Sequence, residues 1–115
     1  MLTNWDLDAA VAGVAALREA VGEPVTWRDY QGTGGNPPGP TYQESVIRAL
    51  FRPVPPGLIS SGLYMKNDLQ MVTGVAVVPG DEIVRFGDTY TVLDQPFVRR
   101  LSDRVVAYET KVRKV

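Results

Sequence analysis

One helix followed by a succession of short strands is the pattern that most constrains how this chain can fold. The clearest helical periodicity lies at residues 4–21, and from Pro24 onward short runs of β-branched and aromatic residues alternate with turns. Glycine and proline supply those turns, with 11 glycines and 9 prolines in 115 residues. A chain of this length forms one domain, residues 1–115, with a single core. We expect a mostly β fold with an N-terminal helix: a small antiparallel β-barrel or sandwich with long loops.

The helix predicted for residues 4–21 has clear signals at both ends. Thr3 or Asn4 can cap it, and Gly22 followed by Pro24 ends it. An apolar stripe suited to the core of the domain recurs at three- and four-residue steps: Leu7, Ala10, Val14, Leu17 and Val21. A second face of mostly small residues suits either solvent or a neighbouring protein: Trp5, Ala9, Ala12 and Ala16.

The next segments are a strand, a loop and an ambiguous stretch. Residues 24–30 alternate like a strand, and residues 31–41, QGTGGNPPGPT, are expected to form a mobile loop. This loop has no lysine and precedes strand-like sequence, so it is not a phosphate-binding loop of the Walker type. Residues 42–52 fit either a helix or a strand, and we favour a strand because Pro53 ends it.

Residues 53–67, PVPPGLISSGLYMKN, combine prolines with apolar side chains on what is predicted to be a long loop. Exposed apolar residues on such a loop need a reason. Either the loop covers the protein's own core, or it contacts a partner or projects into the channel of a ring.

The rest of the chain is predicted to be strands joined by short turns. They are a strand at 68–78 interrupted by Gly74, a hairpin of 82–86 and 89–93 around Gly87-Asp88, a connection at 95–100 and a last strand at 104–113. The total is five or six antiparallel strands.

The residue types that the chain lacks exclude several kinds of chemistry. It contains no cysteine and no histidine, so it has no disulfide, no zinc site of Cys or His type and no Ser-His-Asp triad. Of the candidate carboxylates Asp81, Glu82, Asp88 and Asp94, Asp81 and Asp88 lie in tight turns, where aspartate is favoured for backbone reasons. A site made only of carboxylates stays open. We predict that the protein is not an enzyme and uses no cofactor or metal.

The charge distribution limits the partners. The net charge of −1 argues against general binding to a phosphate backbone. Residues 1–46 carry six acidic and two basic groups, whereas residues 47–115 carry seven acidic and ten basic ones, which is either chance or suited to head-to-tail packing. Arg99, Arg100 and Arg104 are expected in a solvated loop or in contact with phosphate. We see no signal peptide and no apolar stretch of roughly 20 residues, so we expect no membrane partner.

Residues 79–93, PGDEIVRFGDTYTVL, resemble a recurring segment of the small head-to-tail joining proteins of long-tailed phages and gene transfer agents. These proteins are also called stopper or head-closure proteins. The N-terminal helix, the strand start from Gly22 to Arg28 and the final strand at 104–113 are similar to the same family. The likeness does not extend to the loops at 31–41 and 53–67.

The resemblance implies a homo-oligomeric ring, a hexamer or a dodecamer, at the virion neck, assembled from subunits made in the host bacterial cytoplasm. The ring would join the portal or its adaptor ring to the tail terminator or tail tube, and would retain double-stranded DNA and let it pass without sequence-specific binding. Family stoppers often narrow the channel with a long loop, so the candidate channel-facing residues are Pro55, Leu58, Ile59, Leu63, Tyr64, Met65 and Lys66. Candidate contacts between subunits or rings are Trp5, Ala9, Ala12, Ala16, Gly34, Pro38, Arg99 and Arg100.

Two alternatives stay open. A tail terminator or tail-completion protein would share the ring and the small β-rich domain, and would differ in its position in the particle. A small ligand- or nucleic-acid-binding β-barrel would instead show a concave aromatic pocket or a basic face.

Overall fold

The chain starts with α1 (Asn4–Val21), and the computed structural model describes the protein from residue 3 to residue 115. The hydroxyl of Thr3 accepts a hydrogen bond from the Asp6 N–H at 3.1 Å, and the Thr3 N–H donates to the Asp6 carboxylate at 3.1 Å. This capping box satisfies donors that the first helical turn leaves free. At the other end the Gly22 N–H bonds the Arg18 carbonyl at 2.7 Å. The predicted helix boundaries are therefore confirmed.

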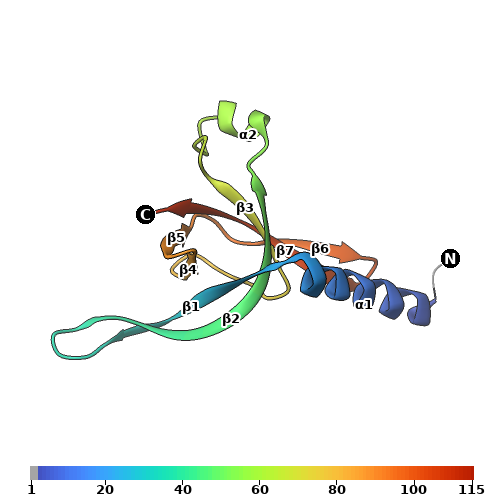
Figure 1. The fold of residues 1–115 in the computed structure, drawn as a ribbon, viewed down its shortest axis with the longest axis horizontal. Coiled ribbons are helices and arrows are strands. Elements are labelled where there is room, and N and C mark those ends of the chain that lie inside the picture. Colours follow the sequence, from blue (N-terminus) through green and yellow to red (C-terminus); the bar gives the residue numbers. More distant parts are fainter. Residues whose placement is uncertain (1–2) are drawn as a thin grey trace.

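Six strands close into an antiparallel barrel, and a seventh lies outside it (Figure 1). Neighbours run in the order β3-β2-β1-β4-β5-β7, and β3 pairs with β7 to close the barrel, while β6 pairs with β7 alone. The mostly β fold with an N-terminal helix is confirmed, and a barrel rather than a sandwich forms. The strands of the described chain are β1 (Glu23–Gly34), β2 (Gly39–Pro53), β3 (Leu69–Thr73), β4 (Glu82–Arg85), β5 (Asp88–Val92), β6 (Phe97–Leu101) and β7 (Arg104–Lys114).

The hydrophobic core fills the barrel. Its side chains come from all six barrel strands and from the segment after β3, so that closing the barrel is what removes them from water. Trp27, Ile47, Phe51 and Leu69 pack against this core and are partly buried. The buried core residues are Val25, Ala49, Met71, Val77, Ile83, Tyr90, Val92 and Val112.

The helix α1 buries a narrower face than its apolar stripe predicts. Leu7 is buried, but Val14, Leu17 and Val21 are 38%, 59% and 60% exposed. The helix lies against β2 and β7, and the Arg18 guanidinium donates to the carbonyl of Val106 at 3.3 Å. The prediction that the whole stripe faces the core is wrong, because the convex outside of a small barrel touches a straight helix along only a narrow line.

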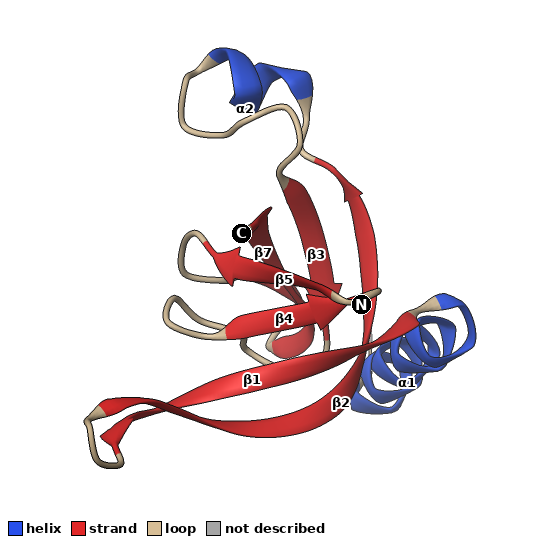
Figure 2. Ribbon diagram, turned by 60° about the vertical axis from the view of Figure 1, so that its left-hand side comes forward, coloured by secondary structure: helices blue, strands red, loops and turns tan. Residues whose placement is uncertain are grey.

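The hairpin of β1 and β2 continues far beyond the barrel, and we call its outer part, residues 29–48, the arm (Figures 1 and 2). The loop predicted for residues 31–41 is wrong, since the two strands stay paired until a turn at residues 35–38. Glycine and proline are tolerated there because the arm is only two strands wide. Pro40 has no N–H to donate, but it lies in the two-stranded part, where the missing donor does not interrupt the interior of a sheet.

Two other strand boundaries differ from the prediction. The strand predicted for residues 68–78 stops at Thr73, and the chain leaves the sheet at Gly74. The connection predicted for residues 95–100 is wrong, because β6 begins at Phe97 and pairs with β7. A run that is short and rich in arginine carries a weak strand signal until its partner strand is known.

The turn between β4 and β5 consists of Phe86 and Gly87, one residue earlier than predicted. Their φ angles of 50° and 80° are those of a type I′ turn, which matches the twist of the flanking strands. Phe86 is also 83% exposed. A bulky residue rarely adopts a positive φ, so this turn is locally strained.

The parts of the chain that extend beyond the barrel make the molecule long for its number of residues. The principal extents are 56 × 36 × 24 Å, and the radius of gyration is 15.9 Å. A compact chain of this length has a radius of gyration of about 13 Å. Because parts of the chain extend beyond the barrel, the protein exposes more surface than a compact domain of the same length.

Candidate interaction surfaces

The segment between β2 and β3 projects from the barrel, and we call residues 54–68 the α2 loop (Figures 1 and 2). The sequence predicts a long loop at 53–67, and its middle in fact forms a short helix, α2 (Pro56–Ser60). Pro56 starts this helix, where the missing N–H of proline costs nothing. The loop therefore contains regular secondary structure.

The foot of the α2 loop is held by buried contacts. Val54 is 2% exposed, and the buried carboxylate of Asp68 accepts two hydrogen bonds from the Arg113 guanidinium, both at 2.9 Å. The Tyr64 hydroxyl donates to the carboxylate of Asp94. The Arg113 contact lowers the pKa of Asp68, and the bond to Asp94 raises the pKa of the Tyr64 phenol, so both contacts persist at neutral pH.

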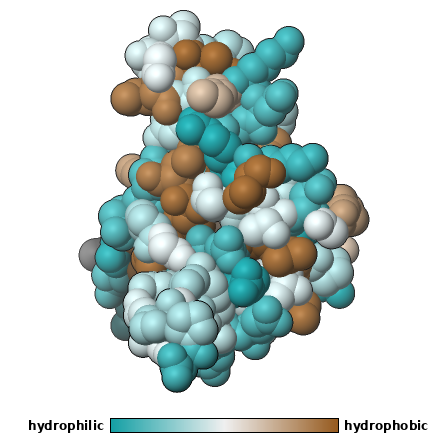
Figure 3. Space-filling view, turned by 90° about the vertical axis from the view of Figure 1, so that its left-hand side faces the viewer, coloured by the Kyte–Doolittle hydropathy of each residue, from teal (hydrophilic) through white to brown (hydrophobic). Residues whose placement is uncertain are grey.

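The tip of the α2 loop exposes apolar side chains. Leu63 and Met65 are 72% and 62% exposed, and Leu58 is 36% exposed. Figure 3 shows apolar residues gathered on this projection and on the part of the barrel below it. Of the residues predicted to face a channel, Pro55, Leu58, Leu63, Met65 and Lys66 are exposed, whereas Ile59 and Tyr64 are half-buried.

The outer side of α1 is a second exposed surface. Trp5 is 78% exposed, and the three alanines of the predicted small-residue face, Ala9, Ala12 and Ala16, are exposed as well. The exposed residues of the predicted apolar stripe, Val14, Leu17 and Val21, lie on another side of the same helix. Most of the surface of α1 therefore consists of exposed apolar or small side chains.

The arm is a third surface, with Gly34 and Pro38 at its end. Beyond the barrel its strands pair only with each other, and a two-stranded ribbon alone is marginally stable in water. Near the barrel the Arg28 guanidinium lies 4.2 Å from the centre of the Tyr42 ring and 3.2 Å from the Glu44 carboxylate. These contacts fix the base of the arm and leave its outer part without support from the barrel.

The arginines after β5 do not form the cluster that their spacing suggests. Arg99 donates to the Glu109 carboxylate at 2.8 Å, and Arg104 lies 3.3 Å from the Asp8 carboxylate. Arg100 is exposed on β6. The segment predicted to be a loop is therefore a strand. Arg99 and Arg104 contact different acidic groups, and the three arginines do not form one basic cluster.

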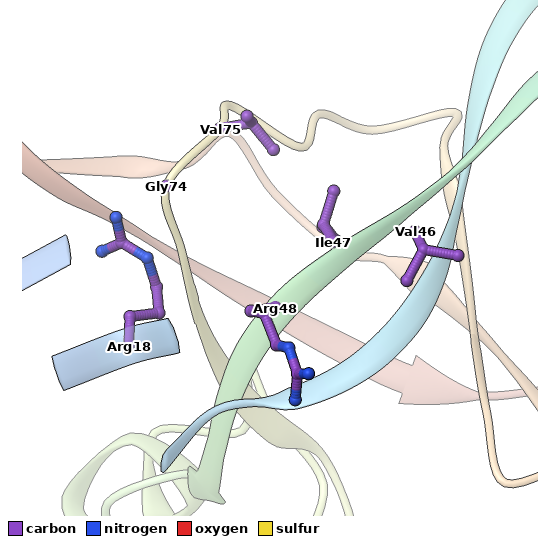
Figure 4. Close-up of a pocket in the computed structure, with 6 residues that line it drawn as sticks. All are labelled: Arg18, Val46, Ile47, Arg48, Gly74 and Val75. Atoms are coloured by element: carbon purple, nitrogen blue, oxygen red, sulfur yellow. The ribbon is translucent and has the colours of Figure 1, made fainter. Parts of the chain in front are cut away.

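A cleft of about 410 Å³ opens beside α1, where β2 and the chain after β3 separate (Figure 4). The Arg18 guanidinium lies against Gly74, where a Cβ would be 2.7 Å from Nη2. Arg48 donates to the Gly22 carbonyl at 3.0 Å. Val46, Ile47 and Val75 complete the lining. Side chains alternate along β2, so Val46 and Arg48 lie on one face of the strand, and Ile47 lies on the other, toward Val75 (Figure 4). The sequence did not predict this cleft, because its residues come from three distant segments.

The candidate catalytic carboxylates are engaged in structural contacts. Asp81 is buried under three N–H donors, and the other three contact basic or phenolic groups: Glu82 with Arg28, Asp88 with Lys114, and Asp94 with Tyr64. Within residues 3–115 no three acidic side chains gather into a group that could hold a metal ion. No helix in the same range is long and apolar enough to cross a membrane.

No protein-family model matches the chain, and no curated protein matches it in sequence.

Proposed function

We propose that this chain is a structural subunit of the head-to-tail connector, a stopper or head-closure protein, in a tailed phage or phage-like particle. The α2 loop is the observation that carries the proposal: an exposed apolar tip stands on a foot fixed by Val54 and the Asp68–Arg113 pair. The likeness of residues 79–93 to the joining proteins supports the same reading.

A barrel with three projections suits a subunit of a ring. The barrel provides a rigid wall, and α1 and the arm offer surfaces that a neighbouring subunit or an adjacent ring could cover. The α2 loop would then point into the channel and narrow it. Residues 53–67 contain no acidic residue and one lysine, so the loop would neither repel DNA strongly nor bind its phosphates strongly enough to hinder exit.

Imaging of particles tests the proposal. Purified protein is added to portal-containing heads that lack it, and a ring of density at the neck is the expected result. A Leu63→Ser, Met65→Ser variant should still join the ring but should retain less DNA, measured as nuclease-protected DNA per head. The matched control is Phe86→Asn, which removes an exposed apolar side chain from the barrel and should retain DNA normally. If the protein stays monomeric and never enters particles, the proposal is wrong.

The alternatives make different predictions for the same particles. A ring at the head-proximal end of isolated tails would indicate a tail terminator or tail-completion protein. A small binding module is favoured by the cleft, whose volume lies in the range of ligand pockets. Saturable binding of a nucleotide or oligonucleotide, lost in Arg48→Ala, would support that function instead.

A further inference from the structure

The barrel strand β2 and the outlying strand β6 each have an edge without a partner. β2 pairs with β3 only from Ala49 to Pro53, so along residues 39–48 it has β1 on one side and no strand on the other within the described chain. β6 pairs with β7 on one side, and no described strand covers its second side. Such edges present unpaired N–H and C=O groups and are sites where another strand can add.

The free edge of β2 borders the cleft. β3 leaves β2 after Thr73, and the cleft occupies the space that a longer β3 would have filled. Val46 stands on this edge and is 73% exposed. Arg48 lies on the same face of β2 as Val46. An aromatic side chain suits this pair, because a cation attracts the face of a ring and the valine gains apolar contact.

The free edge of β6 carries a side chain of that kind. Phe97 is 56% exposed, and Arg99 on the same face has a side-chain exposure of 54%. Trp5 and Phe86 are more exposed than Phe97, but they lie on a helix and in a turn, so neither can face Val46 as part of an added strand.

We propose that β6 of one subunit adds antiparallel to the free edge of β2 of a second copy, with Phe97 packed against Val46 beside the cleft. The register that places Phe97 opposite Val46 also places Arg99 opposite Glu44, because facing residue numbers keep a constant sum in an antiparallel pair. The pair therefore combines an apolar contact with opposite charges, both of which favour cross-strand pairing. Glu44 has a side-chain exposure of 61% and can reach a second arginine.

The contact joins two different surfaces, so it is head-to-tail and can repeat around an axis. It deepens the proposed function by naming the surfaces that join neighbouring subunits, and it rests on that function only for closure into a ring. The added strand would also make the inner part of the arm three strands wide, which supports a ribbon that is marginally stable with two strands.

Cysteine pairing tests the contact, and the natural chain has no cysteine to interfere. Val46→Cys and Phe97→Cys variants are made separately, one of them with an affinity tag, and are mixed under mild oxidation over a concentration series. Facing residues of an antiparallel pair have Cα atoms about 4.5–5.5 Å apart, which a disulfide can bridge. We expect a disulfide-linked heterodimer from the mixture, and no linked species from either variant alone.

A mixture of Val46→Cys with Phe86→Cys is the matched control, since Phe86 is more exposed than Phe97 but lies on no free edge. If the Phe97→Cys mixture yields no more heterodimer than this control, the strand-to-strand contact is wrong. If Val46→Cys links to itself, the edge of β2 pairs two-fold and the head-to-tail contact is also wrong. Neither result changes the outcome of the particle imaging, so failure of the contact and failure of the connector function are distinguishable.

Discussion

Replacing Asp81 by asparagine should destabilise the barrel, because this carboxylate joins β1 to the turn before β4. Asp81 is 2% exposed. Its Oδ2 accepts from the Trp27 indole N–H at 3.0 Å and from the Val78 N–H at 3.1 Å, and its Oδ1 accepts from the Tyr30 N–H at 2.9 Å. Asp81 lies in a turn, as its sequence position predicts, and its carboxylate also bonds two residues of β1.

The magnitude follows from the number of donors. Asparagine has one acceptor oxygen, so its NH₂ group must face at least one of the three N–H groups. An unsatisfied buried donor costs about 1–3 kcal/mol, and the remaining bonds lose the strengthening that the negative charge gives. We expect Asp81→Asn to lower the free energy of unfolding by about 3 kcal/mol, a large part of the about 5–15 kcal/mol that holds a domain folded.

Urea denaturation measures this loss. With an m-value of about 2 kcal/mol/M, the midpoint should fall by about 1.5 M. Asp103→Asn is the control, since that side chain is 76% exposed and should change stability by less than about 0.5 kcal/mol. The indole N–H resonance of Trp27 should move in Asp81→Asn while that of Trp5 stays in place. Equal midpoints for the two variants would refute the reasoning.

Three further predictions concern the helix end, the strained turn and the loop foot. Gly22→Ala should lower stability by about 1–3 kcal/mol in thermal unfolding, because its Cβ would lie 2.4 Å from the Arg18 carbonyl oxygen, whereas Gly13→Ala, with nothing within 4 Å, should stabilise by about 0.5–1 kcal/mol. Phe86→Asn should raise the urea midpoint slightly, with a gain of about 0.5 kcal/mol, because Asn-Gly favours a type I′ turn; an unchanged or lower midpoint would show that the turn is not strained. The folded-state pKa of Asp68 is lowered, so its contribution to stability is complete above the unfolded pKa of about 3.9 and is lost as the pH falls through the folded value. Asp68→Asn should therefore be less stable than the natural protein at pH 7, and denaturation at several pH values should show the difference narrowing below about pH 4.

The α2 loop shows how far the candidate surfaces could be predicted. Its prolines and scattered apolar residues predicted a long loop that either covers the core or projects toward a partner, and the structure places Leu63 and Met65 in water. The cleft could not be predicted, because Arg18, Arg48 and Gly74 meet only after α1, β2 and β3 have packed together. The free edges of β2 and β6 could not be predicted for the same reason, because whether a strand edge is paired depends on strands elsewhere in the chain.

The sequence by itself determined the local elements. The capping signals at Thr3 and the stop at Gly22 define α1, and alternation with turn residues defines the hairpin of β4 and β5, because these signals act between residues a few positions apart. Tertiary structure decided the rest. The pairing of β3 with β7 that closes the barrel joins segments about 40 residues apart. Only that closure determines which face of α1 is buried, how far the arm extends and that Asp81 lies beneath β1, because burial depends on neighbours that the local sequence does not contain.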